Sequence, residues 1–141
     1  MEDRSFYAIT IAQIVAAGVV VWLVFLRPGA WDWQRSVGSA LMFAGMAGIA
    51  LARYQLGRSF AIRPQARQLV THGIYSKIRN PIYVFGSLLF AGFVLVLHRP
   101  GLWLLFAAIV VMQTIRAHRE AQVLEAAFGE AYREYRRKTW F

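Results

Sequence analysis

Residues 69–83 read LVTHGIYSKIRNPIY, and this stretch decides how the rest of the chain is interpreted. It joins a basic segment to an apolar run that carries no charged residue from Asn80 to His98. Pro81 restricts the residue before it to extended geometry and suits the first turn of a helix, so it predicts a helix that begins there. Gly73 can adopt backbone conformations closed to other residues. The stretch therefore predicts a fixed break whose free backbone N–H groups can bind a carboxylate or a phosphate.

Outside this stretch the chain is strongly apolar. Of its 141 residues 58% are hydrophobic and 16% are charged, whereas soluble domains average about 45–50% and about 25%. Four runs hold no Asp, Glu, Lys or Arg, which is typical of helices that cross hydrocarbon. We therefore predict an all-α integral membrane protein, a single domain over residues 1–141. Its expected elements are four spans at approximately 6–26, 36–54, 81–97 and 101–116, the last two forming a helical hairpin, and a cytoplasmic C-terminal helix at 117–138.

The basic residues indicate how such a protein is oriented. With four spans, 13 of the 16 Lys and Arg residues fall on one side, together with both termini and the loop from Arg53 to Arg79. Basic residues are retained on the cytoplasmic side, so both termini and this loop are expected to be cytoplasmic. The first apolar run is longer than the apolar region of a signal peptide and is expected to be a retained span. We expect a multi-pass protein of a bacterial inner membrane.

The net charge of +9 bears on the partners of the protein. The charges lie between apolar runs, which suits anionic headgroups of membrane lipids and argues against nucleic acid as a partner. Within the second run, Ala40, Ala44 and Gly48 recur every four residues. This spacing predicts either a ridge on which another helix packs closely in lipid or an ordinary alanine-rich helix.

Two groups of side chains are candidates for chemistry. Tyr75 and Tyr83 offer aromatic faces to adenine or to a cation, and the alternative is that they only anchor a helix at the headgroups. Arg116 and Glu120 are four residues apart on one helical face, and the alternative is a surface ion pair. The chain has no cysteine. With two histidines and no third well-placed ligand near these groups, we expect no metal site.

Taken together, these motifs carry a family resemblance. The residues concerned are LVTHGIY at 69–75, RNPIY at 79–83, and Glu120, Leu124, Phe128, Gly129, Tyr132 and Tyr135. In this order and spacing the sequence resembles the isoprenylcysteine carboxyl methyltransferase and phospholipid methyltransferase superfamily. The resemblance covers residues 69–135, nearly half of the chain. Two positions depart from the pattern of the superfamily: Asn80 stands where histidine is commoner, and Ala121 where a second glutamate is usual.

The resemblance implies a membrane-embedded enzyme that uses S-adenosylmethionine and releases S-adenosylhomocysteine. It implies a cytoplasm-facing cofactor pocket and a lipid-soluble substrate, with Arg116 facing that substrate. The residues implied to line the cofactor pocket are Arg67, Gln68, Leu69, Val70, Tyr75, Asn80, Pro81, Ile82, Tyr83 and Glu120.

Three functions remain open on the sequence. The first is methyl transfer to a lipophilic acceptor of the isoprenylcysteine carboxylate type, which needs mainly orientation because a carboxylate is already nucleophilic. The second is N-methylation of a phospholipid amine, which needs a base to remove a proton. The third is a small non-enzymatic membrane protein that binds anionic lipid or a partner.

Overall fold

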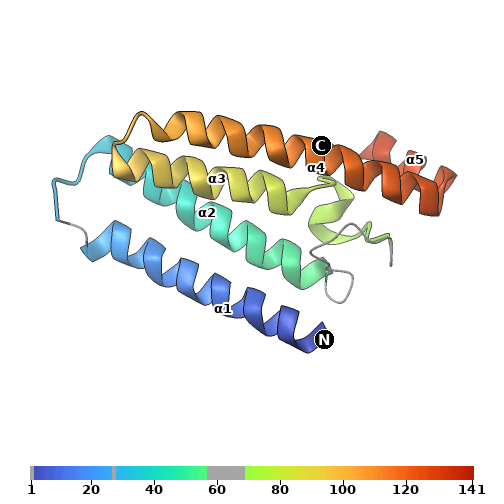
Figure 1. Ribbon diagram of the computed structural model, residues 1–141, viewed down its shortest axis with the longest axis horizontal. Coiled ribbons are helices and arrows are strands. Elements are labelled where there is room, and N and C mark those ends of the chain that lie inside the picture. The colour runs from blue at the N-terminus through green and yellow to red at the C-terminus, as the bar shows by residue number, and fades with distance from the viewer. Residues whose placement is uncertain (1, 27, 57–68) are drawn as a thin grey trace.

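The computed structural model describes residues 2–26, 28–56 and 69–141, with side chains from Ile11 onward. All regular elements in these residues are helical, which confirms the predicted all-α class. The long helices lie lengthwise beside one another (Figure 1). In chain order the elements are α1 (Glu2–Val21), the π-helical turn η1 (Trp22–Leu26), α2 (Trp33–Leu56), the 3₁₀ turn η3 (Gly73–Ser76), α3 (Pro81–Leu97), α4 (Leu102–Phe128) and α5 (Glu130–Lys138).

Two of these helices, α2 and α4, are long and apolar enough to cross a membrane. Two shorter apolar helices accompany them, Ile11–Leu26 and Pro81–Leu97. The second of these has the bounds expected for the third span, because Pro81 occupies the first turn of α3 and starts the helix there. The turn that follows α3 makes α3 and α4 a helical hairpin.

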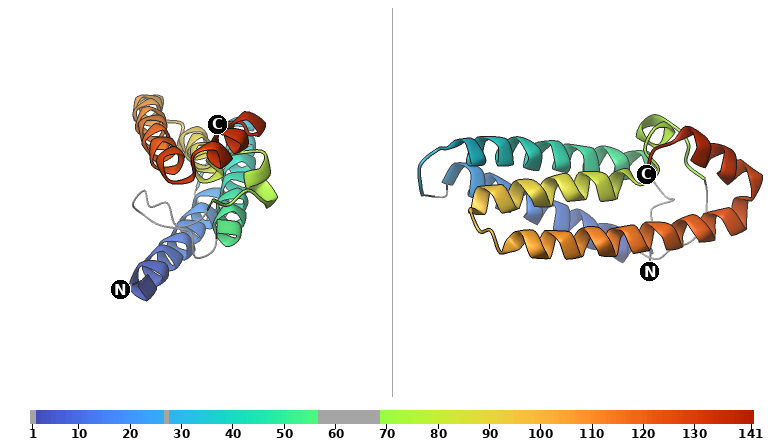
Figure 2. Two further views of the ribbon diagram at one scale, coloured as in Figure 1. Left: turned by 90° about the vertical axis from the view of Figure 1, so that its right-hand side faces the viewer. Right: turned by 90° about the horizontal axis from the view of Figure 1, so that it is seen from above.

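The end of α4 differs from the prediction. A C-terminal helix was expected at 117–138, but its first part belongs to α4, which continues without a break to Phe128. The chain turns instead at Gly129, which has φ 54° and ψ −123°, a conformation that residues with a side chain rarely adopt. The shorter helix α5 starts at the next residue and runs back along the bundle (Figure 2). The sequence between 116 and 128 has no helix breaker, so the loss of apolar character at Arg116 does not end the helix.

The most extensive helix contact lies between α2 and α3, and glycine makes it possible. A Cβ atom on Gly38 would come within 2.7 Å of the Gly92 carbonyl oxygen, and one on Gly45 within 2.6 Å of the Phe85 carbonyl oxygen. Gly48 packs in the same way against the ring of Phe85. The backbones of the two helices are therefore in direct contact along this line.

Of the two interpretations of Ala40, Ala44 and Gly48, the packing ridge holds only at Gly48, and the two alanines lie on an ordinary exposed face. Gly48 faces α3 as expected, but Ala40 and Ala44 are exposed. The interface instead uses Gly38 and Gly45, which are seven residues apart and so stay on one face of a helix over two turns. Residues spaced by four shift by about 40° around the helix at each step, so Ala40, Ala44 and Gly48 do not share one face.

The end of the bundle remote from α5 is held by polar contacts. Arg35, only 6% exposed, donates to the Val24 carbonyl oxygen from Nε at 3.2 Å and from Nη2 at 2.7 Å, and to the Gly29 carbonyl oxygen at 3.1 Å. At the same end His98 Nε2 lies 2.7 Å from the Asp32 carboxylate. These contacts tie the segment before α2 to η1 and to the turn before α4.

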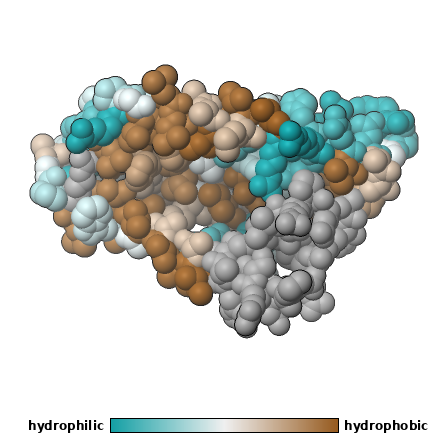
Figure 3. All heavy atoms as spheres, in the orientation of Figure 1, coloured by the Kyte–Doolittle hydropathy of each residue, from teal (hydrophilic) through white to brown (hydrophobic). Residues whose placement is uncertain are grey.

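The surface has an apolar middle and a hydrophilic end. Figure 3 shows apolar atoms over the middle of the helices and a hydrophilic surface at the end that carries α5. The exposed side chains of α4 include Leu104, Val111 and Met112, each more than half exposed. This division of the surface into an apolar and a hydrophilic region agrees with the sequence, in which the charged residues lie between long uncharged runs.

Candidate active site

The turn η3 is held in place by a side chain from α2. Gln55, near the end of that helix, accepts a hydrogen bond from the Ile74 backbone N–H at 2.7 Å. Gly73, with φ 60°, lies directly against the Gln55 amide, so a Cβ atom at this position would collide with it. Gln55 was not among the residues selected from the sequence. It lies 19 residues before Ile74 and belongs to no motif, so only the folded chain reveals its role.

The segment between η3 and α3 pairs with residues that follow α5. The Trp140 N–H donates to the Lys77 carbonyl at 2.7 Å, and the Arg79 N–H donates to the Trp140 carbonyl at 3.0 Å. These bonds make an isolated parallel bridge. In addition, the Tyr135 hydroxyl of α5 donates to the Tyr75 carbonyl at 2.7 Å. The motif at 69–83 is thus fixed on one side by α2 and on the other by α5 and the residues after it.

The two groups of candidate side chains meet between α3 and α4. Tyr83, in the first turn of α3, donates from its hydroxyl to Glu120 Oε1 at 2.7 Å. Arg116 donates from Nε to the same oxygen at 3.1 Å, and its guanidinium carbon lies 6.0 Å from the centre of the Tyr83 ring. The pairing of Arg116 with Glu120 was expected from their spacing. The contact of both with Tyr83 joins residues separated by 37 positions in the sequence.

The predicted cofactor residues lie in different surroundings. Val70 and Tyr75 are buried in a cluster with Ala52, against which Ile82 packs. Pro81 is fully buried, while Asn80, Leu69 and Glu120 are half-buried. Arg67 and Gln68 lie outside the described residues. The structure therefore gathers the described members at one end of the bundle, with Tyr83, Glu120 and Arg116 in direct contact.

The two tyrosines beside this group remain protonated at neutral pH. Burial raises the pKa of Tyr75, and the nearby Tyr135 and Glu120 raise it further. Burial also raises the pKa of Tyr135 to about 12. Both phenols therefore keep their protons, and the Tyr135 hydroxyl stays a donor to the Tyr75 carbonyl.

Residues 33–131 match the family model described as phospholipid methyltransferase. This match spans well over half of the chain, from α2 into α5. The chain belongs to this family. It is part of the superfamily of membrane methyltransferases that the motifs at 69–135 resemble, so the resemblance is confirmed. Comparison with curated proteins and with solved structures finds no match for this chain.

Membership in the phospholipid methyltransferase family gives the clustered residues a context. The matched region contains Tyr83, Arg116 and Glu120 as well as Gln55 and η3.

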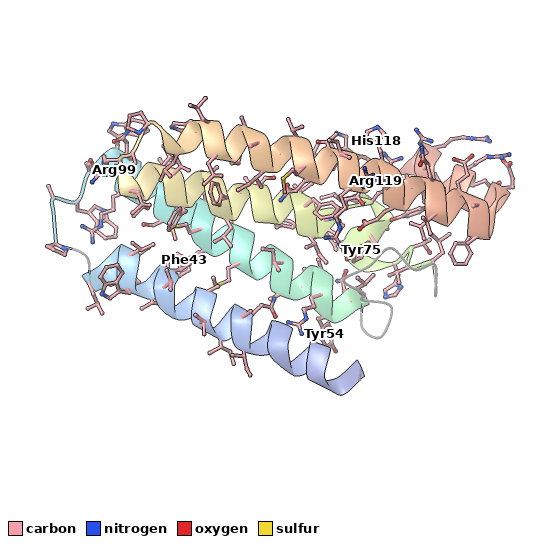
Figure 4. All side chains as sticks on the ribbon, viewed as in Figure 1. Phe43, Tyr54, Tyr75, Arg99, His118 and Arg119 are labelled. Carbon is pink, nitrogen blue, oxygen red and sulfur yellow. The ribbon has the colours of Figure 1, made fainter. Side chains whose placement is uncertain are left out.

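Figure 4 places Tyr75 toward the same end of the molecule as His118 and Arg119, with Arg99 at the opposite end. His118 is exposed and contacts the carbonyl of Thr114 in its own helix at 2.8 Å. Among the described residues no group of three His, Asp or Glu side chains could hold a metal ion.

Proposed function

We propose that this protein transfers a methyl group from S-adenosylmethionine to an amphiphilic acceptor at the cytoplasmic face of a membrane. The observation that carries this proposal is the contact of Tyr83 and Arg116 with a single oxygen of Glu120. It lies at the hydrophilic end of two apolar helices, in a chain of the phospholipid methyltransferase family. Residues 1–141 act in this proposal as one domain with four spans.

The chemistry of the site fits the cofactor. The hydrogen bonds described for Glu120 use Oε1, so Oε2 can accept from ribose hydroxyls or from an ammonium group. The Tyr83 ring offers an aromatic face beside this carboxylate. The residues that would complete the pocket are Arg67, Gln68, Leu69, Val70, Tyr75, Asn80, Pro81 and Ile82. Because Val70, Tyr75 and Pro81 are buried, they would act through backbone atoms or by shaping the pocket.

A carboxylate of the isoprenylcysteine type is the leading acceptor. When bound, the cofactor would supply an electrophilic methyl group to a carboxylate oxygen. The electron pair of the broken sulfur–carbon bond would go to sulfur, and no proton would be released. Arg116, whose side chain is 45% exposed, would hold such an anionic headgroup by its planar donor groups. The chain then supplies mainly orientation and exclusion of water.

A phospholipid amine is the second candidate acceptor, and the description of the matched family favours it. An ammonium headgroup must lose a proton before it can attack the methyl group. Glu120 is the carboxylate nearest to the proposed acceptor position, but the positive charge of Arg116 beside it opposes binding of a second cation. The two acceptors are distinguished by mass spectrometry of the methylated product before and after treatment with mild alkali. Alkali removes the methyl group of a methyl ester and leaves the methyl group of an N-methyl amine in place.

The proposed topology places both termini, the loop from Arg53 to Arg79 and the active site in the cytoplasm of a bacterial cell. The natural chain has no cysteine, so single cysteines can report on it. We expect an impermeant thiol reagent outside intact cells to label a cysteine at Ala30 and to leave one at Lys77 unlabelled. Both residues are exposed, so accessibility within the fold is matched. The reverse pattern would mean that the orientation is inverted.

The test of the proposed function is binding of S-adenosylhomocysteine, measured by calorimetry on the purified protein in detergent. We expect saturable binding to the wild-type protein and a loss of at least tenfold in affinity for Glu120→Ala, because a charged hydrogen bond is worth about 1.5–3 kcal/mol. Glu120→Gln keeps an acceptor and should show a smaller loss. The matched control is Glu134→Ala, an exposed carboxylate on α5, which should bind as the wild type does.

Two results would contradict the proposal. Equal affinity in the wild type and Glu120→Ala would remove Glu120 from the cofactor site. No binding to a folded wild-type protein, together with association that depends on anionic lipid, would favour the non-enzymatic alternative.

A further inference from the structure

A second polar contact joins α3 and α4 farther into the apolar part of the bundle. The Ser87 hydroxyl donates to Gln113 Oε1 at 2.8 Å, and both side chains are half-buried. Both residues belong to runs of sequence that contain no charged residue. In hydrocarbon an amide that lacks partners is costly, so a glutamine at this depth needs a specific reason.

The register places this contact in line with the candidate active site. Gln113 precedes Glu120 by seven residues, which is two turns of the same helical face and about 10 Å along α4. Ser87 follows Tyr83 by four residues, one turn farther along α3. The contact of Ser87 with Gln113 is thus the next layer after the contact of Tyr83 with Glu120, on the same sides of the two helices.

The third layer along this pair of helices is aromatic. The rings of Phe90 and Phe106 stack with centres 6.1 Å apart and planes inclined by 7°, and Trp103 meets Phe106 edge-on. From the hydrophilic end outward, the two helices therefore present a charged layer, an amide layer and an aromatic layer. This order matches an amphiphile whose headgroup is charged, whose linkage is polar and uncharged, and whose chain is apolar.

One half of the Gln113 amide remains available to a ligand. Its oxygen accepts from Ser87, which fixes the orientation of the amide, and no hydrogen bond of the described residues uses Nε2. The neighbouring position on α3 is Gly86, where a Cβ atom would lie 3.7 Å from Nε2. A glycine here presents no side chain to the amide N–H groups, and these keep some accessible surface, because no buried side-chain nitrogen of the described residues lacks a hydrogen-bond partner. Such N–H groups bind a carbonyl oxygen.

We infer that Ser87 and Gln113 form a binding site for the uncharged polar linkage of the methyl acceptor. Gln113 Nε2 donates to a carbonyl oxygen of an ester or amide, and Ser87 holds the amide in the required orientation. This inference rests on the proposed function and narrows the acceptor class. It favours the phospholipid candidate, whose ester carbonyls lie between the headgroup and the acyl chains, over an isoprenylcysteine, whose apolar chain is attached through a thioether. The acceptor therefore has a carbonyl group between its headgroup and its apolar chain. When the acceptor is bound, this carbonyl lies about 10 Å from Glu120, measured along α4.

A different role for the same pair is to join the two helices, as interhelical hydrogen bonds commonly do in lipid. The two roles predict different measurements. A pair that only joins helices affects the melting temperature and leaves the acceptor constant unchanged. A binding site affects the apparent KM for the acceptor.

The experiment follows transfer of labelled methyl groups from S-adenosylmethionine to a total lipid extract in mixed micelles. Gln113→Leu is expected to raise the apparent KM for the extract about three- to tenfold, with affinity for S-adenosylhomocysteine within twofold of the wild type. Ser87→Ala keeps Nε2 and should have a smaller effect. The matched control is Thr114→Val, since the Thr114 hydroxyl bonds the Val110 carbonyl of its own helix.

Gly86→Val provides an independent variant, because it covers Nε2 without removing any polar group, and it should raise the same KM. The inference is overturned if Gln113→Leu and Gly86→Val leave the KM within twofold of the wild type, whatever happens to the melting temperature. Failure of the wild type to bind S-adenosylhomocysteine, or to label any lipid, instead overturns the proposed function and this inference with it.

Discussion

The two faces of α3 show different ways of packing a helix. Toward α2 the contact is made by Gly38, Gly45 and Gly92, and the backbones touch. Toward α4 the contacts are side-chain hydrogen bonds and ring stacking, and only 6% of the most apolar part of α4 is buried. Close glycine packing holds two helices rigidly, because the backbone atoms are already in van der Waals contact and the helices cannot move closer or rotate without a clash. Long side chains can change rotamer, so the α3–α4 pair can admit a ligand while α2–α3 keeps its shape.

The strongest test of this comparison adds one methyl group to each face of α3. In Gly92→Ala the new Cβ would lie 2.8 Å from Met42 Cγ and closer still to the Gly38 carbonyl oxygen, so the helices must separate. We expect a loss of about 1–3 kcal/mol in the free energy of unfolding, or no folded protein. The measurement is thermal or denaturant unfolding in detergent.

Gly86→Ala is the matched variant on the other face of the same helix. Its Cβ would meet only Gln113 Nε2, at an ordinary contact distance of 3.7 Å. We expect its stability to lie close to that of the wild type. Equal destabilisation of the two variants would show that the close contact with α2 is not what makes glycine necessary in α3, because helix propensity by itself favours alanine over glycine.

A smaller effect is expected on the face of α4, at Arg116. If this residue holds an anionic acceptor, Arg116→Ala should raise the apparent acceptor constant about tenfold with unchanged affinity for S-adenosylhomocysteine. Arg116→Lys should also be impaired, since an ammonium lacks the planar pair of donors. Loss of S-adenosylhomocysteine binding in folded Arg116→Ala would assign the residue to the cofactor site instead.

The smallest effect concerns the contact that fixes the turn between α3 and α4. The Arg35 backbone N–H and the His98 side chain hold the pKa of Asp32 below its usual value. A group with a lowered folded-state pKa contributes stability above its ordinary pKa and loses that contribution as the pH falls through the folded-state value. We expect Asp32→Asn to lower the melting temperature slightly at neutral pH, and the difference from the wild type to shrink as the pH falls below about 4 and to vanish below the folded-state pKa of Asp32. A constant difference across this range would exclude ionisation of Asp32 as the cause.

The sequence predicted those parts of the molecule that local chemistry controls. Pro81 gave the start of α3, since its ring excludes a helical residue before it. The spacing of Arg116 and Glu120 gave their contact, because four residues make one helical turn. The roles of the cofactor residues remain predictions.

The parts that the sequence did not predict depend on contacts between distant segments. The choice of Gly38 and Gly45 over Ala40 and Ala44 depends on which face of α2 meets α3, and the sequence of α2 alone does not specify that face. The support of η3 by Gln55 joins residues that no local pattern relates. Gly129 is a local signal for the end of α4, because glycine is common just after the last residue of a helix, yet the predicted helix at 117–138 ran through it.

The buried arginine at the start of α2 has a consequence for biogenesis. Arg35 is surrounded by main-chain oxygens of Val24 and Gly29 and by the ring of Trp31, 4.9 Å from its guanidinium. These groups all precede Arg35 in the chain, so they are synthesised first. An arginine at the edge of hydrocarbon is costly until its donors are satisfied. In the proposed four-span topology, the first two helices are therefore best inserted together, as a hairpin in which the earlier helix supplies the hydrogen-bond acceptors that Arg35 of the later helix requires.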